Sequence, residues 1–374
     1  MSTPIVQGWC PGAFKPMMSG DGLVVRIRPI AAEISPIQAE GIAAAALEFG
    51  NGFIDLTNRA NLQIRGVSTD NYPRLMDRLA GLDLLDEDPD NEPKRNIVLT
   101  PFYTENDLSH RLYQALLARL PDFPLFPGKF GFSIDCGPKL VLKDVPADIR
   151  FETSAAQGII VRAEGCATGV EVSEAQSVDM ALALADWFMK TRPDDIRRMP
   201  KLLLQQKLPA EFQGSGPADT SEQSLPGNIN GGLSLAVPFG PLQAEELSKL
   251  SKLDTALRVT PWHALWMEGV DAVQNTRLIS DASDPVLRVH ACAGHPFCPQ
   301  ATVKTRQLAA DLAGRWDGQL HVSGCSKGCA FPKSADVTLV GRDGTFDLVT
   351  NGAPWDEARQ TGLAPDTLKE LDLT

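Results

Sequence analysis

The sequence lacks any apolar run that approaches about 18 residues, the length that a membrane-spanning helix needs. Its first residues also lack a basic segment followed by an apolar one, which is the pattern of a secretion signal. We therefore expect a cytoplasmic protein without a membrane partner.

Basic residues are scarce as well, since 35 Lys and Arg stand against 47 Asp and Glu, for a net charge of −12. This balance argues against a nucleic-acid partner. No Gly-x-Gly-x-x-Gly follows a strand and opens a helix, so we expect no built-in nicotinamide or flavin module. Any reducing equivalents would then come from a separate partner, an electron-donor reductase or NAD(P)H. No Ser-His-Asp arrangement or pair of catalytic carboxylates stands out, so the catalytic residues stay unassigned.

The cysteine count is odd, seven in all, and does not indicate a disulfide framework. Three cysteines are scattered singly, and we expect ordinary semi-buried thiols at Cys10, Cys136 and Cys166. The other four are grouped within the last quarter of the chain.

These four form two pairs, Cys292-x5-Cys298 and Cys325-x3-Cys329. Four thiolates that converge on one site repel one another unless a cation neutralises them, so such sets usually mark metal sites. Zinc is the alternative, but zinc sites usually space paired ligands by two to four residues, which fits the x5 pair poorly. We predict a 4Fe-4S cluster. The nearby histidines are expected to be hydrogen-bond donors or surface residues rather than ligands: His290, His295 and His321.

Self-similarity indicates the architecture. Residues 53–67 and 256–270 share a Thr and a closing Gly-Val at one spacing, because the sequence separation from Thr57 to Gly66 equals that from Thr260 to Gly269. We therefore predict an α+β fold with two related modules about a pseudo-twofold axis. Strands are expected over 23–28, 53–56, 62–67, 96–101, 129–134, 158–163 and 232–237. Helices are expected over 36–49, 72–82, 109–120, 177–191, 243–253 and 301–316.

Several segments resemble the sulfite and nitrite reductase family. The cluster motif is similar in His290-Ala-Cys-Ala-Gly-His-Pro-Phe-Cys-Pro299 and Ser323-Gly-Cys-Ser-Lys-Gly-Cys329. The family's tetrapyrrole-facing and anion-binding stretches resemble Arg26-Ile-Arg28, Leu56-Thr-Asn-Arg-Ala-Asn-Leu-Gln63, Lys94-Arg95-Asn96-Ile97 and Gly128-Lys129-Phe130. The resemblance implies two tandem ferredoxin-like half-repeats and two reductase-like α+β domains, the C-terminal one holding the cluster. The expected units are 1–85 (first half-repeat), 86–212 (first α+β domain), 213–230 (linker), 231–285 (second half-repeat) and 286–374 (cluster domain).

Two further segments look most like the precorrin-hydroxylating branch of that family, which serves aerobic cobalamin biosynthesis: Gly8-Trp-Cys-Pro-Gly-Ala-Phe-Lys-Pro-Met-Met-Ser-Gly-Asp-Gly-Leu23 and Thr260-Pro261-Trp262. This implies hydroxylation of precorrin-3A at ring carbon C20 with formation of a ring-A lactone, using dioxygen. It assigns electron transfer to the 4Fe-4S cluster and oxygen activation to a separate iron, whose ligands stay unassigned.

The alternative within the family is a sirohaem-dependent sulfite or nitrite reductase, in which the residue matching Cys329 also bridges to haem iron. Two departures favour the precorrin branch. Gly131 stands where sulfite reductases carry a second lysine after Lys129, and Lys327 stands where they often carry Asn. A third hypothesis, from another class, is a zinc-stabilised binding module without catalysis.

Basic side chains gather in the first half of this acidic chain. A precorrin carries many carboxylates, which bidentate guanidinium groups suit. The candidates for substrate binding are Arg26, Arg28, Asn58, Arg59, Asn61, Gln63, Arg95 and Lys129. The alternatives are that the arginines cover the wet face of a sheet and that the amides cap a turn. In the second repeat, Trp262 and His263 take the equivalent turn, where an aromatic ring either covers a macrocycle or fills the core.

Overall fold

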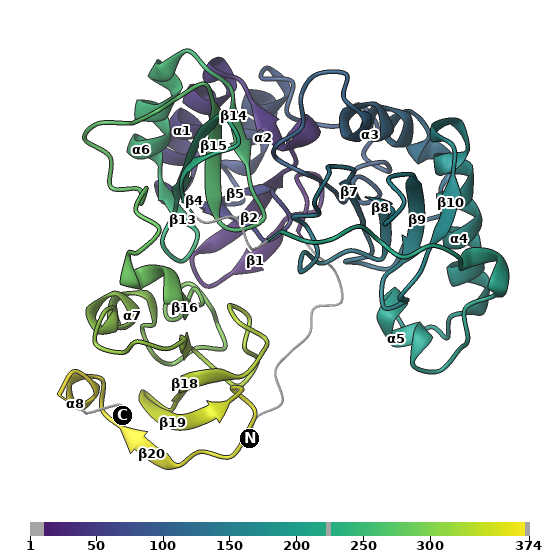
Figure 1. Ribbon diagram of the computed structural model, residues 1–374. Helices are drawn as coiled ribbons and strands as arrows, with labels where there is room; N and C mark the ends of the chain where they lie inside the picture. The colour runs from purple at the N-terminus through teal and green to yellow at the C-terminus, as the bar shows by residue number, and fades with distance from the viewer. Residues whose placement is uncertain (1–10, 222–225, 371–374) are drawn as a thin grey trace.

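The computed structural model describes residues 11–221 and 226–370, so Gly8, Trp9 and Cys10 lie outside the described residues. Its strands form four five-stranded sheets, two in the half-repeats and one in each of the other domains. In Figure 1 the two half-repeats lie side by side, with one domain beside them and the C-terminal domain, in yellow, below. The α+β fold is confirmed.

The sheet of the first half-repeat, here called sheet A, has the order β1-β2-β5-β4-β13. Its strands are β1 (Met17–Ser19), β2 (Gly22–Ile27), β5 (Leu62–Val67), β4 (Phe53–Leu56) and β13 (Pro241–Gln243). Sheet B of the second half-repeat has the order β11-β12-β15-β14-β3. Its strands are β11 (Gly227–Ile229), β12 (Gly232–Ala236), β15 (Ala264–Glu268), β14 (Leu257–Val259) and β3 (Glu33–Ile34). Each half-repeat thus contributes one edge strand to the other's sheet.

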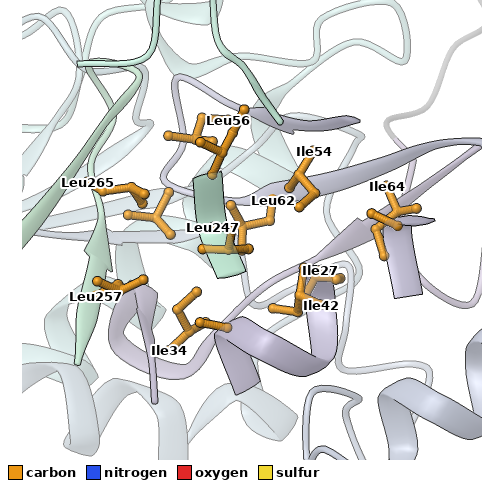
Figure 2. Packing of buried hydrophobic residues seen from close by; sticks show 14 of the residues in the cluster. Ile27, Ile34, Ile42, Ile54, Leu56, Leu62, Ile64, Leu247, Leu257 and Leu265 are labelled. Carbon is orange, nitrogen blue, oxygen red and sulfur yellow. The ribbon is translucent and has the colours of Figure 1, made fainter. Parts of the chain in front are cut away.

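The helices of the half-repeats cover one face of these sheets: α1 (Pro36–Phe49), α2 (Tyr72–Ala80) and α6 (Ala244–Leu250). Helix α1 begins at Ser35, whose side chain accepts from the Gln38 N–H while Gln38 reaches back to the Ser35 N–H. This capping box explains why the Ala-rich run starts where it does. Alternation along β5 places Leu62 and Ile64 inside, where Figure 2 shows them among leucines and isoleucines of both half-repeats.

The predicted repeat is confirmed at the level of single hydrogen bonds. Thr57 Oγ1 accepts from the N–H groups of Arg59 and Asn61, at 3.3 and 3.1 Å. Thr260 Oγ1 accepts in the same way from Trp262 and Ala264, at 3.4 and 3.2 Å. The third residue after each threonine, Ala60 in one turn and His263 in the other, has a left-handed backbone, with φ of 54° and 56°.

The two remaining sheets share one topology, three parallel strands followed by two antiparallel ones. In the first domain they are β6 (Ile97–Leu99), β7 (Phe132–Asp135), β8 (Ile149–Thr153), β9 (Ile159–Ala163) and β10 (Val170–Val172). In the C-terminal domain they are β16 (Val289–Ala291), β17 (Leu320–Ser323), β18 (Ala335–Arg342), β19 (Thr345–Gly352) and β20 (Gln360–Leu363). The helices are α3 (Leu108–Ala118), α4 (Ser177–Thr191), α5 (Met199–Leu203), α7 (Arg306–Leu312) and α8 (Pro365–Leu368).

Three elements differ from the sequence predictions. Helix α7 is shorter than the predicted 301–316, because the residues before it form the loop around the cysteines, where the Ala301 N–H donates to Cys298 O. The predicted helix over 243–253 is preceded by β13, an edge strand supplied to the other half-repeat. The expected linker 213–230 is anchored to the first domain, with bridges that include Ser215 to Gly169 and Pro217 to Ser154. Within residues 11–221 and 226–370, no helix is long and apolar enough to span a membrane.

Candidate functional site

The four predicted cluster ligands gather at one edge of the C-terminal sheet. Cys292 directly follows β16, and Cys325 follows the neighbouring parallel strand β17, so both emerge at the carboxyl ends of adjacent strands. Burial raises the pKa of the Cys292 thiol, and the thiols of Cys298 and Cys325 are close enough to raise it further. Cys329 is exposed at the surface, and the charge of its thiolate would interact with those of the other three cysteines. Thiols arranged in this way need a cation to become thiolates.

Backbone donors surround the Cys292 sulfur. The Gly324 N–H donates to Cys292 Sγ at 3.1 Å, and the Gly294 N–H also lowers the pKa of this thiol. Hydrogen bonds to ligand sulfurs tune iron–sulfur clusters. A Cβ at position 324 would lie 2.7 Å from Ala301 Cβ and 3.4 Å from Cys292 Sγ, so only glycine lets the backbone approach this closely. The residues present therefore fit a thiolate-bound cluster.

Within the described ranges, no three His, Cys, Asp or Glu side chains lie close enough together to hold a single metal ion. In a 4Fe-4S cluster each thiolate binds a different iron, so the four cysteines need not share one ion. The ligands of the possible second iron stay unassigned among these residues.

The three nearby histidines lie in three different settings. His290 stacks on Phe331, with ring centroids 4.1 Å apart, and its Nε2 pairs with Gln319 Oε1 at 2.8 Å. His321 is fully buried in β17, which lowers its pKa to about 4. His295 is exposed, and its N–H donates to Val303 O. None of these contacts is to a cysteine.

The second group of candidates lies on the face of sheet A opposite the helices. Because Leu62 and Ile64 point into the core, Gln63 and Arg65 point to the open face, together with Arg26 and Asp55, which are both paired in register with Gln63. Arg26 Nη2 donates to Gln63 Oε1 at 3.2 Å. This open face therefore carries guanidinium, amide and carboxylate groups.

The turn between β4 and β5 extends this polar surface towards the first domain. Arg59 Nη2 donates to Lys129 O at 2.7 Å, which brings two predicted substrate-binding segments together. The Lys129 side chain is exposed, as is that of Asn58, whereas Asn61 is buried in the turn. Arg26 and Gln63 are partly exposed, whereas Arg59, which joins the two segments, is only 8% exposed.

Arg28 and Arg95 lie beneath that surface, in ion pairs that the sequence pattern did not indicate. Arg28 pairs with Glu92, and burial lowers the Arg28 pKa to about 10. Arg28 Nε is buried and meets no partner among the described residues. Arg95 Nε and Nη2 bind the Asp86 carboxylate at 2.7 and 2.8 Å, and Nη1 donates to Arg28 O at 2.6 Å. Arg28 and Arg95, both predicted to bind the substrate, therefore also stabilise the fold.

The face of sheet B that corresponds to the polar face of sheet A carries different side chains. Arg258 takes the position of Asp55, and its guanidinium lies 3.8 Å from the Tyr103 ring centroid and 5.0 Å from that of Trp266. Trp262, at the position of Arg59, stacks on Phe102 with centroids 6.2 Å apart. Aromatic packing therefore closes the face that remains polar in sheet A, and Trp262 packs against protein.

The position of the missing second lysine has no room for any side chain. A Cβ on Gly131 would lie 2.5 Å from both Asn96 Nδ2 and Asn96 O. Asn96 is itself fixed, since its Nδ2 donates to Phe130 O at 2.7 Å. A lysine at 131 would require Asn96 and its backbone to move.

Comparison with known proteins finds one matching family model and several related proteins. Residues 15–82 match the model of the nitrite/sulfite reductase ferredoxin-like half domain. A protein named precorrin-3B synthase, from Sinorhizobium sp, is 30% identical over 93% of this chain and 83% of its own length. A ferredoxin–nitrite reductase of Synechococcus elongatus is 23% identical over 97% of this chain and 88% of its own length.

Among solved structures, the NirA protein of Mycobacterium tuberculosis superposes with a TM-score of 0.70 at 17% identity, over 93% of this chain and 79% of that one. This likeness concerns the fold alone. The identity to the Sinorhizobium protein extends over most of both chains. The chain belongs to the precorrin-3B synthase family, oxidoreductases built on the nitrite and sulfite reductase fold.

Proposed function

We propose that this protein hydroxylates precorrin-3A at ring carbon C20, with formation of a ring-A lactone, in aerobic cobalamin biosynthesis. One oxygen atom of dioxygen enters the macrocycle, and the other is reduced to water by electrons from a separate donor and protons from solvent. The relative named precorrin-3B synthase supports this assignment. The observation that carries it is the contrast between the polar face of sheet A, where Arg26 and Gln63 are partly exposed, and the aromatic packing against sheet B.

The substrate is a polycarboxylate, and sheet A offers donors that match it. Arg26, Arg59 and Lys129 would bind carboxylates at the rim, since guanidinium and ammonium groups form strong charge-assisted hydrogen bonds. Asn58 and Gln63 would orient the macrocycle through their amides. The unpaired Arg28 Nε lies beneath this face and fits an anionic group as well. Arg95 would act mainly by holding the Arg28 backbone.

The four cysteines, Cys292, Cys298, Cys325 and Cys329, would hold a 4Fe-4S cluster beside this face. A bound cluster would supply single-electron transfer to the site. The chain's own contribution is to bring the two parts together, because the loop that ends at Cys298 contacts the hairpin of β1 and β2.

The sirohaem reductase is the second candidate, favoured by the relatives named ferredoxin–nitrite reductase. Against it stands the crowding at Gly131, where a second sulfite-binding lysine would collide with Asn96. The visible spectrum of the purified protein separates the candidates. Sharp haem-type Soret and long-wavelength bands would contradict the proposal as stated. Stoichiometric zinc without iron or labile sulfide would remove both enzymes.

Binding is tested by anaerobic titration of the protein with precorrin-3A. Arg59→Ala should weaken affinity about tenfold or more, because a hydrogen bond to a charged group contributes roughly 1.5–3 kcal/mol. The control is Arg74→Ala, which removes an exposed ion pair between α2 and Glu48 of α1. Equal affinities of the two variants would show that the polar face does not bind the substrate.

A further inference from the structure

One backbone carbonyl in the cysteine loop is held by three donors from the first half-repeat. Phe297 O, directly before Cys298, accepts from Ser19 Oγ at 2.6 Å, Arg65 Nη2 at 3.1 Å and Gly20 N at 3.3 Å. The partners are more than 200 residues apart in sequence, with a separation of 232 between Arg65 and Phe297. This carbonyl is therefore a fixed point between the cluster domain and sheet A.

Arg65 is the only one of these donors that is charged, and it is firmly held. Its Nη2 binds Asp21 Oδ1 at 2.9 Å and Ser19 Oγ at 3.0 Å, and its Nη1 binds Asp55 Oδ2 at 3.2 Å. Although burial opposes the charge, Asp55 and Asp21 outweigh it and raise the pKa of Arg65. The residue is 8% exposed and remains a cation in this setting.

The same network reaches the helix behind the cysteines. Arg306, in α7, approaches the second oxygen of Asp55 at 3.4 Å, so that carboxylate lies between two guanidinium groups from different domains. Asp55 is paired in register with Gln63 on the open face of sheet A. Arg65 thus links the proposed substrate surface to Phe297, the residue directly before the predicted cluster ligand Cys298.

We infer that Arg65 is a positioning residue that fixes the Cys298 corner of the cluster against the precorrin-binding face. The inference rests on the 4Fe-4S cluster of the proposed function. Removal of the guanidinium takes away one of the three donors to Phe297 O and leaves the carboxylates of Asp21 and Asp55 without this partner. Both effects act on the cluster: the first loosens one ligand, and the second makes the surroundings more negative and lowers the reduction potential.

Arg258, a buried arginine of sheet B at the repeat position of Asp55, supplies a matched control. This arginine is 7% exposed, pairs with Glu33 and Glu268, and donates to the carbonyls of Pro101 and Tyr103. Those carbonyls lie in the loop after β6, the counterpart of the loop after β16. The β6 loop carries no predicted cluster ligand, so loss of Arg258 removes comparable structure without touching the cluster.

The experiment compares the cluster-loaded wild type with R65Q, R65K and R258Q. The measurements are the rate of loss of cluster absorbance in excess chelator, the midpoint potential from an anaerobic redox titration, and the urea midpoint of unfolding. We expect R65Q to lose its cluster about tenfold faster, as is typical when a support of a metal ligand is removed. Its potential should be more negative, with partial recovery of both properties in R65K. R258Q should keep the wild-type rate and potential even where its urea midpoint falls.

Equal rates and potentials in R65Q and R258Q would overturn the inference, because the effect would then be general destabilisation. Should R65Q fail to fold, Ser19→Ala removes one donor to Phe297 O and is expected to accelerate cluster loss in the same direction; an unchanged rate overturns the inference. A wild type that binds no iron or labile sulfide would instead refute the proposed function, so the two failures are distinguishable.

Discussion

Replacement of Arg95 by alanine should destabilise the protein strongly, whatever its effect on the substrate. The Arg95 side chain is 5% exposed and forms two hydrogen bonds with Asp86 and one with Arg28 O. Its loss leaves the largely buried Asp86 carboxylate without a counterion. Breaking a buried pair in this way typically costs about 3–5 kcal/mol. We expect urea unfolding, followed by circular dichroism, to show a loss in that range.

A double variant separates support of the fold from contact with the substrate. Arg95→Met with Asp86→Leu removes both charges, so most of the lost stability should return, since a buried pair replaced by apolar groups is often neutral. If precorrin affinity returns with stability, Arg95 acts through the fold. If stability returns and affinity does not, Arg95 contacts the substrate as its sequence position predicts. An Arg95→Ala variant that unfolds at the wild-type urea concentration would refute the reasoning from the ion pair.

Three other substitutions test separate parts of the account. Gly131→Ala should destabilise by about 1–3 kcal/mol in urea, because its Cβ overlaps Asn96, and a neutral result would show that the site can expand. Burial raises the pKa of Asp135 to about 6, so between about pH 4 and pH 6 the folded state keeps a proton that the unfolded state releases. The free energy of unfolding therefore falls as pH rises through that window. Asp135→Asn should remove up to about 3 kcal/mol of this fall. Identical pH profiles of the free energy of unfolding in the variant and the wild type would contradict the prediction. Cys325→Ser should abolish the broad cluster absorbance around 400 nm, an order-of-magnitude expectation from cluster chemistry, and an unchanged spectrum would mean that the ligands are misassigned.

Local patterns predicted the parts of the fold that local forces determine. Helix α1 and strands β4 and β5 begin and end where the sequence indicates, because the capping box at Ser35 and the alternation along 62–67 act within a few residues. The repeat was equally visible, since the turn at Thr57 has its equivalent at Thr260. The exchange of β3 and β13 between sheets was not predicted, because short edge strands take their partners from tertiary packing.

The site shows the same division. The spacing of four cysteines within two short segments was enough to predict that they gather. The partners of the arginines were not predictable, since Glu92 lies 64 residues from Arg28 and carries no pattern of its own. The same holds for the contact of Arg65 with Phe297 O. The basic residues looked alike in sequence, and the structure separates them by burial: Arg26 is partly exposed, whereas Arg28, Arg59 and Arg95 are buried.

The central claim is that the polar face of sheet A and the cysteine cluster together oxygenate a precorrin. The most direct measurement is an anaerobic incubation of the iron–sulfur-loaded protein with reductant and precorrin-3A, followed by labelled dioxygen and mass analysis of the macrocycle. The account predicts a product that has gained one labelled oxygen atom and formed a lactone. Recovery of unchanged precorrin-3A from a protein that instead reduces sulfite or nitrite would contradict it.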